Sequence, residues 1–447
     1  MDATEAAPAT CAPLDAGGPT VYSALGLDAS LGDAASWSVF DIAPLGISGF
    51  SGGVFDDRYV YFAGRGDAIL RYDTQAAFTA QTSWIVFFVS SAPFGSSGGF
   101  EGAVYDGRYV YFIPDESAGP TYTHLTIRYD TTLPFNATTS WTQFDMSTLA
   151  DSGAPIAGYA GGTFDGTYVY YAPRANDAGP FGRVARYDTR GAGIDAGDAA
   201  TPNFDNAANW SLFDLTTLPS TQSTSTTIAV GFFGAMYDGT WVYFVPQLND
   251  AFGGVIRGGE SSIVARVKAS DPLQTSSSWQ LYDMSAVSGE AADFIGAGFD
   301  GRYVYFVPQA NQIVTRFDTT TSTMSSTSNW SQYDLAQILP PWDATIPRYS
   351  GAVFDGRFMY FVPAVAGFGT LVRYDTTSTF TSDCAWSLTD LTAMTFDGLV
   401  PQGMVGAIFD GQYVYLVPAT NTLMLRFEAK TPPSMPDAGP FYNGSFL

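Results

Sequence analysis

The chain has 447 residues, of which 46% are hydrophobic, 15% aromatic and 14% charged. This composition excludes a disordered chain, because 34 Phe, 26 Tyr and 9 Trp supply ample apolar surface for a core. The 43 acidic and 19 basic side chains give a net charge of -24, which would repel nucleic acid and an anionic membrane surface.

Residues 1–35 are rich in Ala, Pro, Gly and Asp, and we expect them to form a flexible leader. This segment lacks the basic and apolar regions of a signal peptide, and the sequence has no run of about 18 apolar residues that could cross a membrane. Lysine is nearly absent, a bias associated with exported bacterial proteins. We therefore expect an extracytoplasmic protein, secreted or held at a cell surface. There Cys11 and Cys384 can form a disulfide, and two unpaired thiols are the alternative.

One phrase recurs along residues 36–430. Its first copy is Gly-Gly-Val-Phe-Asp-Asp-Arg-Tyr-Val-Tyr-Phe, from Gly52 to Phe62. The acidic residue at its turn occurs seven times, at Asp56, Asp106, Asp165, Asp238, Asp300, Asp355 and Asp410. An element of the form aliphatic-x-Arg-aromatic, with Val267 in the aromatic place in the fourth copy, follows each copy, and its arginine is Arg71, Arg128, Arg186, Arg266, Arg316, Arg373 or Arg426. A third element, Ser-Trp or a close variant, contains Trp37, Trp84, Trp141, Trp210, Trp279, Trp330 and Trp386.

Each copy predicts four short strands. The first is an apolar run that ends before the turn, where Asp-Gly in six copies favours a two-residue hairpin. The second is the run of aromatic and β-branched residues after the turn, which ends at a proline in six copies. The third strand carries the arginine and the fourth carries the tryptophan. The second strand is apolar on both faces, which is typical of a sheet packed between two other sheets.

Four-stranded units of this size, arranged radially, form a β-propeller. One tryptophan strand, at Trp37, precedes the first copy. The prediction is therefore an all-β, seven-bladed propeller over residues 36–430, closed by pairing of the Trp37 strand with the last blade and followed by a tail at residues 431–447. The architecture resembles the propellers of the kelch-like and WD-like superfamilies. The repeat lacks the Gly-His and Trp-Asp signatures of WD repeats, and within the phrase the kelch Gly-Gly pair is complete only at Gly52-Gly53 and Gly161-Gly162.

Residues that recur in every blade are expected to build the blade. The repeated arginines and the nearby aspartates favour charge-assisted hydrogen bonds between strands or between blades. The repeated tryptophans favour packing on the outer strand. A distinctive site is expected where the copies differ, around the mouth of the axial channel, at the face where the first strands begin and the second strands end.

Two sets of divergent positions lie at this face. The first set, near the start of the first strand, is Ser51, Glu101, Ala160, Phe233, Ile295, Ser350 and Val405. The second set, just after the second strand, is Arg65, Asp115, Arg174, Gln247, Gln309, Ala364 and Ala419. The predicted ligand contacts are Arg65, Glu116, Tyr159, Arg174, Gln247, Asp293, Gln309, Arg348 and Tyr349. Insertions at residues 174–183, 216–230 and 247–262 are expected to form one wall of the mouth.

Glu101, Asp115 and His124 come from one blade and are the best candidates for acid–base chemistry on a glycosidic bond. A carboxyl near aromatic rings has its pKa raised by desolvation. The alternatives are a solvated or arginine-paired Glu101 and an inert surface His124. One His and two Cys exclude transition-metal chemistry, and no phosphate-binding or dinucleotide motif occurs. No cofactor is expected. A calcium site formed by Asp side chains and backbone carbonyls is the alternative that stays open.

The function expected from these features is the binding of a glycan or polysaccharide at the channel mouth by a monomeric, lectin-like protein. Two alternatives stay open. One is a polysaccharide hydrolase or lyase that uses Glu101, Asp115 and His124, and the other is a protein-interaction scaffold.

Overall fold

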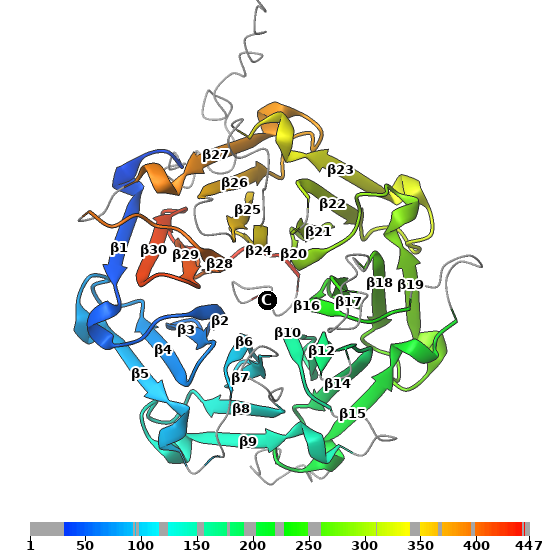
Figure 1. The fold of residues 1–447 in the computed structure, drawn as a ribbon, viewed down its shortest axis with the longest axis horizontal. Coiled ribbons are helices and arrows are strands. Elements are labelled where there is room, and N and C mark those ends of the chain that lie inside the picture. The colour runs from blue at the N-terminus through cyan, green and yellow to red at the C-terminus, as the bar shows by residue number, and fades with distance from the viewer. Residues whose placement is uncertain are drawn as a thin grey trace, which may run out of the picture.

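The computed structural model describes residues 31–92, 94, 98–115, 124–149, 156–176, 179–191, 203–219, 228–248, 261–309, 311–339, 349–364, 369–394, 398–439 and 442. These residues form seven four-stranded antiparallel sheets around a central axis (Figure 1). The predicted seven-bladed propeller is confirmed. In the described part of the chain, no helix is long and apolar enough to span a membrane.

The inner half of each blade is a hairpin. Its first strand lines the axis, and these strands are β2 (Phe50–Phe55), β6 (Phe100–Tyr105), β10 (Tyr159–Phe164), β16 (Phe232–Tyr237), β20 (Phe294–Phe299), β24 (Tyr349–Phe354) and β28 (Met404–Phe409). The second strands are β3 (Tyr59–Gly64), β7 (Tyr109–Pro114), β11 (Tyr168–Pro173), β17 (Trp241–Pro246), β21 (Tyr303–Pro308), β25 (Phe358–Pro363) and β29 (Tyr413–Pro418).

The outer half of each blade carries the repeated Arg and Trp. The third strands are β4 (Ala68–Asp73), β8 (Leu125–Asp130), β14 (Arg183–Asp188), β18 (Ile263–Lys268), β22 (Ile313–Asp318), β26 (Thr370–Asp375) and β30 (Leu423–Glu428). The outermost strands are β5 (Trp84–Phe88), β9 (Trp141–Asp145), β15 (Trp210–Asp214), β19 (Trp279–Asp283), β23 (Trp330–Asp334), β27 (Trp386–Asp390) and β1 (Trp37–Asp41). A small extra hairpin, β12 (Ala175–Asn176) with β13 (Gly179–Pro180), follows β11.

Short 3-10 turns flank the outermost strands, and no α-helix occurs among the described residues. The turns before these strands are η1 (Ala34–Ser36), η3 (Gln81–Ser83), η5 (Thr138–Ser140), η7 (Ala207–Asn209), η9 (Ser276–Ser278), η11 (Thr327–Asn329) and η13 (Asp383–Ala385). The turns after them are η2 (Ala43–Leu45), η4 (Val89–Ser91), η6 (Met146–Thr148), η8 (Leu215–Thr217), η10 (Met284–Ala286), η12 (Leu335–Gln337) and η14 (Leu391–Ala393).

The ring closes as the sequence predicts. Strand β1 pairs antiparallel with β30, so that Trp37 lies opposite Phe427 and Asp41 lies opposite Leu423. The last blade therefore has the order β1-β30-β29-β28 and contains both ends of the ring. Closure removes the two open blade edges that a linear array would expose.

The repeated turn aspartate organises each inner hairpin. The carboxylate of Asp355 accepts hydrogen bonds from the N–H groups of Arg357 at 2.8 Å and Phe358 at 2.7 Å, and from the Tyr360 hydroxyl at 2.8 Å. The same Asp-to-Tyr bond is present in all seven blades at 2.6 to 2.9 Å. The repeated Asp and Tyr therefore tie the turn to the second strand.

The repeated arginine connects neighbouring blades. Its guanidinium carbon lies 3.9 to 4.2 Å from the centroid of the ring that begins the second strand of its own blade. Arg128 also donates to the Tyr187 hydroxyl of the next blade at 3.1 Å, and Arg426 donates to Tyr72 at 3.2 Å. Arg71 and Arg316 make the same bond, so the expected charge-assisted bonds between blades are present in at least four blades, with tyrosine rather than aspartate as the acceptor.

The repeated tryptophan packs the outer strands against each other. Trp141 stacks on Phe87 of the preceding blade with ring centroids 4.2 Å apart, and its Nε1 donates to the Phe135 carbonyl at 2.9 Å. The equivalent tryptophans are 4 to 7% exposed. They are packing residues and are too buried to stack on a sugar ring.

The segment after β30 crosses the face that carries the hairpin turns, opposite the mouth. Ser434 N–H donates to the Gly411 carbonyl at 2.8 Å, and the buried Lys430 ammonium donates to the Ser434 carbonyl at 3.0 Å. Further along, the Tyr442 hydroxyl donates to the Phe354 carbonyl at 2.8 Å and accepts from the Phe354 N–H at 3.2 Å. This tail therefore joins the last blade to the blade before it.

Candidate functional site

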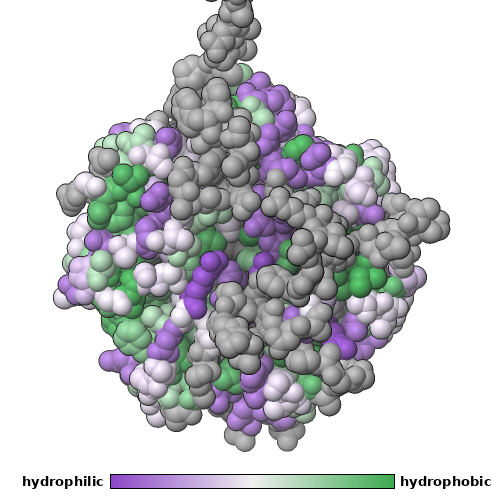
Figure 2. All heavy atoms as spheres, in the orientation of Figure 1, coloured by the Kyte–Doolittle hydropathy of each residue, from purple (hydrophilic) through white to green (hydrophobic). Residues whose placement is uncertain are grey.

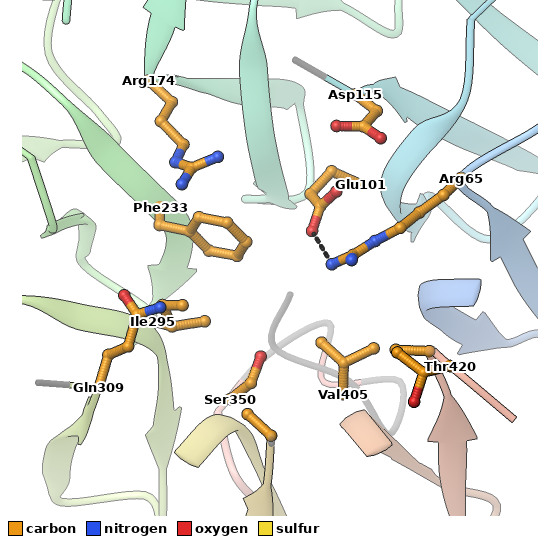
Figure 3. A pocket seen from close by; sticks show the side chains of 12 residues that line it. Arg65, Glu101, Asp115, Arg174, Phe233, Ile295, Gln309, Ser350, Val405 and Thr420 are labelled. Carbon is orange, nitrogen blue, oxygen red and sulfur yellow. Dashed lines mark hydrogen bonds and ion pairs between the residues drawn. The ribbon is translucent and has the colours of Figure 1, made fainter. Parts of the chain in front are cut away.

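A cavity of about 320 Å³ lies at the channel mouth. Its described lining comes from both divergent sets and consists of Arg65, Glu101, Asp115, Arg174, Phe233, Ile295, Gln309, Ser350, Ala364, Val405, Ala419 and Thr420 (Figure 3). Figure 2 shows hydrophilic side chains beside the hollow at the centre of this face. The structure thus brings together residues from all seven blades that lie far apart in the sequence.

A repeated backbone bond makes the two sets meet. The residue after the second strand donates its N–H to the carbonyl of the residue just before the first strand of the same blade. The distance is 2.8 Å for Arg65 to Gly49, 2.9 Å for Asp115 to Gly99 and 3.0 Å for Gln309 to Asp293. This bond holds the divergent side chains at the rim in register around the ring.

A β-bulge then turns the divergent residue of the first strand toward the axis. The pairing register shifts at this point in every blade, as between Phe100 and Ala103. The residue after the divergent one is a glycine with φ between 66° and 133° in six blades, at Gly102, Gly161, Gly234, Gly296, Gly351 and Gly406. Such φ values favour glycine, and bulges re-aim side chains in this way. Phe100 is consequently buried between blades, whereas Glu101 lines the cavity.

Glu101 is the central charged group of the cavity. Its side chain is 4% exposed, and its Oε1 accepts a hydrogen bond from Nη2 of Arg65 at 3.1 Å. Burial raises the pKa of Glu101 to about 7; the neighbouring Asp115 carboxylate acts in the same direction, and the Arg65 guanidinium opposes both. The Glu101 carboxyl is thus partly protonated at neutral pH. The arginine-paired alternative for Glu101 is therefore the geometry observed.

A second guanidinium belongs to a chain of hydrogen bonds on the other side of the cavity. Nε of Arg174 donates to Oε1 of Gln247 at 2.6 Å, and Nε2 of Gln247 donates to Oε1 of Gln309 at 2.6 Å. The Arg174 guanidinium carbon lies 4.9 Å from the Phe233 ring centroid. Burial lowers the pKa of Arg174 to about 10, although the Glu101 and Asp115 carboxylates act in the opposite direction. Gln247 links Arg174 to Gln309 and is not itself among the lining residues.

The remaining wall is apolar. Phe233 and Ile295 pack with Ala160 in a small cluster at the rim, and Val405 and the small side chains of blades 6 and 7 complete it. Six divergent positions that line the cavity were not among the predicted site residues: Phe233, Ile295, Ser350, Val405, Ala364 and Ala419. Their divergence from the repeat is the sequence signal that marks them, and five of the six are apolar.

Three predicted site residues lie elsewhere. Tyr159 and Tyr349 are fully buried between blades, because the bulge turns the following residue, and not them, toward the axis. His124 precedes β8, and its Nε2 lies 3.7 Å from Oδ1 of Asp145 on the outermost strand. His124 is not among the lining residues, so the structure does not assemble it with Glu101 and Asp115.

Several predicted residues lie outside the described part of the chain or outside the lining. Glu116, Arg348 and Cys11 lie outside the described residues, as does much of each predicted insertion, while Cys384 is disulfide-bonded. Asp293, just before β20, has φ of 54°, and its carboxylate acts on the pKa of Arg174 from outside the lining. The described residues contain no group of three or more His, Cys, Asp or Glu side chains that could hold a metal ion.

Similar solved structures include the virginiamycin B lyase of Staphylococcus aureus, with a TM-score of 0.53 and 11% identity over 88% of this chain and 98% of that one. The β-propeller domain of Cps50 (Swd1) from Myceliophteria thermophila has a TM-score of 0.50 and 9% identity over 86% and 97%. U3-55K has a TM-score of 0.51 and 8% identity over 89% and 99%. No protein-family model and no curated protein matches the chain. At such identities the likeness shows the fold alone.

Proposed function

We propose that this protein is an extracytoplasmic propeller that binds a glycan in the cavity at the channel mouth. The observation that carries the proposal is the composition of the lining. One part is a set of fixed hydrogen-bonding groups, Arg65, Glu101, Asp115, Arg174 and Gln309, and the other is an apolar surface that includes Phe233, Ile295 and Val405. At about 320 Å³ the cavity falls at the small end of the range for ligand pockets.

A sugar ring matches both kinds of surface. Each hydroxyl donates and accepts, so neighbouring hydroxyls are satisfied by a guanidinium on one side and a carboxylate on the other. The C–H faces of the ring can lie on Phe233 and Val405 while the hydroxyls point to Arg65 and Glu101. The cavity holds carboxylates as well as guanidiniums, which favours a neutral ligand over a strongly anionic one.

A glycan array followed by titration calorimetry tests this proposal. Replacement of Arg65 in Arg65→Met removes one charged donor from the rim, and we expect the affinity for the best ligand to fall about tenfold or more. Arg58→Met is the matched control, because Arg58 pairs with Asp73 at 2.9 Å near the turns of the opposite face. Absence of binding to every glycan would reject the proposal, and equal losses in both variants would reject the site.

A second candidate function is supported by the protonation of Glu101. A buried carboxyl with a pKa of about 7 beside a second carboxyl can exchange a proton with a bound substrate at neutral pH. The corresponding activity would be a polysaccharide hydrolase or lyase that uses Glu101 and Asp115, without His124.

Turnover assays on polysaccharides that the protein binds distinguish the two candidates. An enzyme would lose turnover in Glu101→Gln while it still binds, and its rate would follow a pH profile with an inflection near the pKa of Glu101. His124→Ala should leave that profile unchanged, since His124 lies outside the lining. If the wild-type protein binds these polysaccharides but turns none of them over, the enzymatic candidate is rejected and the lectin function is retained.

A further inference from the structure

The hydrogen-bond chain from Arg174 fixes the polarity of Gln309. A guanidinium can only donate, so the amide oxygen of Gln247 faces Arg174 and its nitrogen faces Gln309. The nitrogen of Gln247 in turn donates to the amide oxygen of Gln309 at 2.6 Å. The Nε2 group of Gln309 is therefore left for the cavity, and Figure 3 shows this nitrogen on the cavity side of the amide.

Ser350 adds a second polar atom on the same side of the cavity. Its side chain is buried, its Oγ has no hydrogen-bond partner among the described residues, and Figure 3 shows the oxygen directed inward. Ser51 is at the same position of the repeat in another blade, but its hydroxyl donates to the carbonyls of Phe100 and Ala63. A buried hydroxyl without a partner is destabilising, so the Ser350 hydroxyl calls for a partner that a ligand can supply.

Small apolar side chains line the cavity together with these two groups. Ala364 follows the second strand of the same blade as Ser350, and Val405 is the equivalent of Ser350 in the next blade. The hydrogen-bond donors on this side of the cavity are an uncharged amide and a hydroxyl, so a ligand group can bind here without contacting either arginine of the lining. A neutral acceptor oxygen that carries a small apolar group fits such a surface better than a carboxylate does.

We propose that this side of the cavity is a subsite for the acylamino group of an N-acylated sugar. The acyl oxygen accepts from Nε2 of Gln309 and from Oγ of Ser350, and the acyl methyl packs on Val405 and Ala364. The inference rests on the proposed glycan-binding function and narrows it to a substrate class.

Calorimetry with two probes tests the subsite. N,N′-diacetylchitobiose, called chitobiose below, and cellobiose share the same glycosidic linkage and differ in carrying acetamido or hydroxyl groups at C2, so the difference in their affinities isolates the acylamino contact. We expect the wild-type protein to bind chitobiose about tenfold or more tightly than cellobiose, which corresponds to about one to two hydrogen bonds. Gln309→Glu should remove this preference, because a carboxylate still accepts from Gln247 but no longer donates to the acyl oxygen.

Matched variants separate the contact from effects on folding. Ser350→Ala should weaken chitobiose binding roughly threefold to tenfold without lowering the melting temperature, because it removes a buried hydroxyl that has no described partner. Ser51→Ala should do the reverse, lowering the melting temperature and leaving the affinity unchanged. Gln75→Glu, on an exposed turn, controls for the added charge of Gln309→Glu.

The outcomes are distinguishable. Equal affinities for chitobiose and cellobiose would overturn the acylamino subsite and leave the proposed glycan function standing. A chitobiose preference that survives both Gln309→Glu and Ser350→Ala would overturn the assignment of these residues. No binding to either probe, together with an empty glycan array, would overturn the inference and the proposed function together.

Discussion

Arg65 and Glu101 belong to neighbouring blades and meet at the channel mouth, where Nη2 of Arg65 donates to Oε1 of Glu101 over 3.1 Å. The pair is asymmetric, because the Arg65 side chain is 42% exposed and that of Glu101 only 4%. The carboxyl therefore bears most of the desolvation, and one guanidinium at the rim does not offset it. Both the charge of the cavity and its response to pH follow from this imbalance.

The first prediction concerns the pH dependence of stability. Since the pKa of Glu101 is raised from 4.5 to about 7 on folding, the folded protein keeps a proton that the unfolded chain has released. This contribution is fully present below about pH 4.5 and is lost as the pH rises through about 7. The side chain in Glu101→Gln stays neutral at every pH. The melting temperature of this variant should therefore rise relative to that of the wild-type protein as the pH increases from about 5 to about 8.

The control for this comparison is Glu290→Gln, an exposed glutamate in the turn before β20. Its melting temperature should differ from that of the wild-type protein by a constant amount across the same pH range. If the melting temperature of Glu101→Gln also differs by a constant amount, Glu101 is ionised over the whole of this pH range, and the second candidate function loses its support.

The repeat made the architecture predictable from the sequence. The Asp-Gly turn predicts the same local structure in six copies, and the aromatic second strand and the tryptophan do so in all seven, so a single misread copy could not change the fold. The position of Trp37 before the first copy was sufficient to predict the pairing of β1 with β30. Divergence from the repeat then located Arg65, Glu101, Asp115, Arg174 and Gln309 at the mouth.

Side-chain direction was the part that the sequence could not supply. Tyr159 and Glu101 are one repeat position apart, and only the bulge decides which of these positions faces the axis. His124 shares a blade with Glu101, yet it lies directly before β8, where its Nε2 is 3.7 Å from Oδ1 of Asp145 on the outermost strand. The polarity of Gln309 depends on two hydrogen bonds that span three blades.

Gly99 provides a second prediction, because it lies directly against the backbone of Arg65. A Cβ at residue 99 would be 1.9 Å from the Arg65 carbonyl oxygen, a distance that requires the rim to move. Gly99→Ala should therefore displace Arg65 from Glu101, abolish glycan binding and lower the free energy of unfolding by about 1–3 kcal/mol. Gly289→Ala has nothing within 4 Å of the added carbon and should be silent in both measurements. Unchanged binding by Gly99→Ala would show that the Arg65 position is not needed.

The tail gives a third prediction. Tyr442→Phe removes the hydroxyl that bonds both the N–H and the carbonyl of Phe354. Leaving these two backbone groups without their partner should cost about 1–3 kcal/mol of unfolding free energy, measured by denaturant titration. Glycan affinity should stay constant, since the tail lies on the face opposite the mouth. A change in affinity with no loss of stability would contradict this separation of the two faces.

Ring closure supplies the last prediction, through Trp37. This side chain is 6% exposed, its ring centroid lies 5.1 Å from that of Phe427, and its Nε1 donates to the Leu31 carbonyl at 3.0 Å. If β1 is an integral strand of the last blade, Trp37→Ala should cost about 3–5 kcal/mol of global stability, as for any buried tryptophan. Trp84→Ala, at the same position of the first blade, should cost a similar amount.

The two variants separate a closed ring from an open ring with a loosely attached strand. In a closed ring, each substitution lowers a single cooperative unfolding transition by the same amount, and amide exchange in β30 accelerates only with global unfolding. In an open ring, Trp37→Ala would free β1 alone, so exchange in β30 would accelerate while the main transition stayed in place. Hydrogen exchange measured beside the denaturant curve therefore decides whether the pairing of β1 with β30 carries the closure of the propeller.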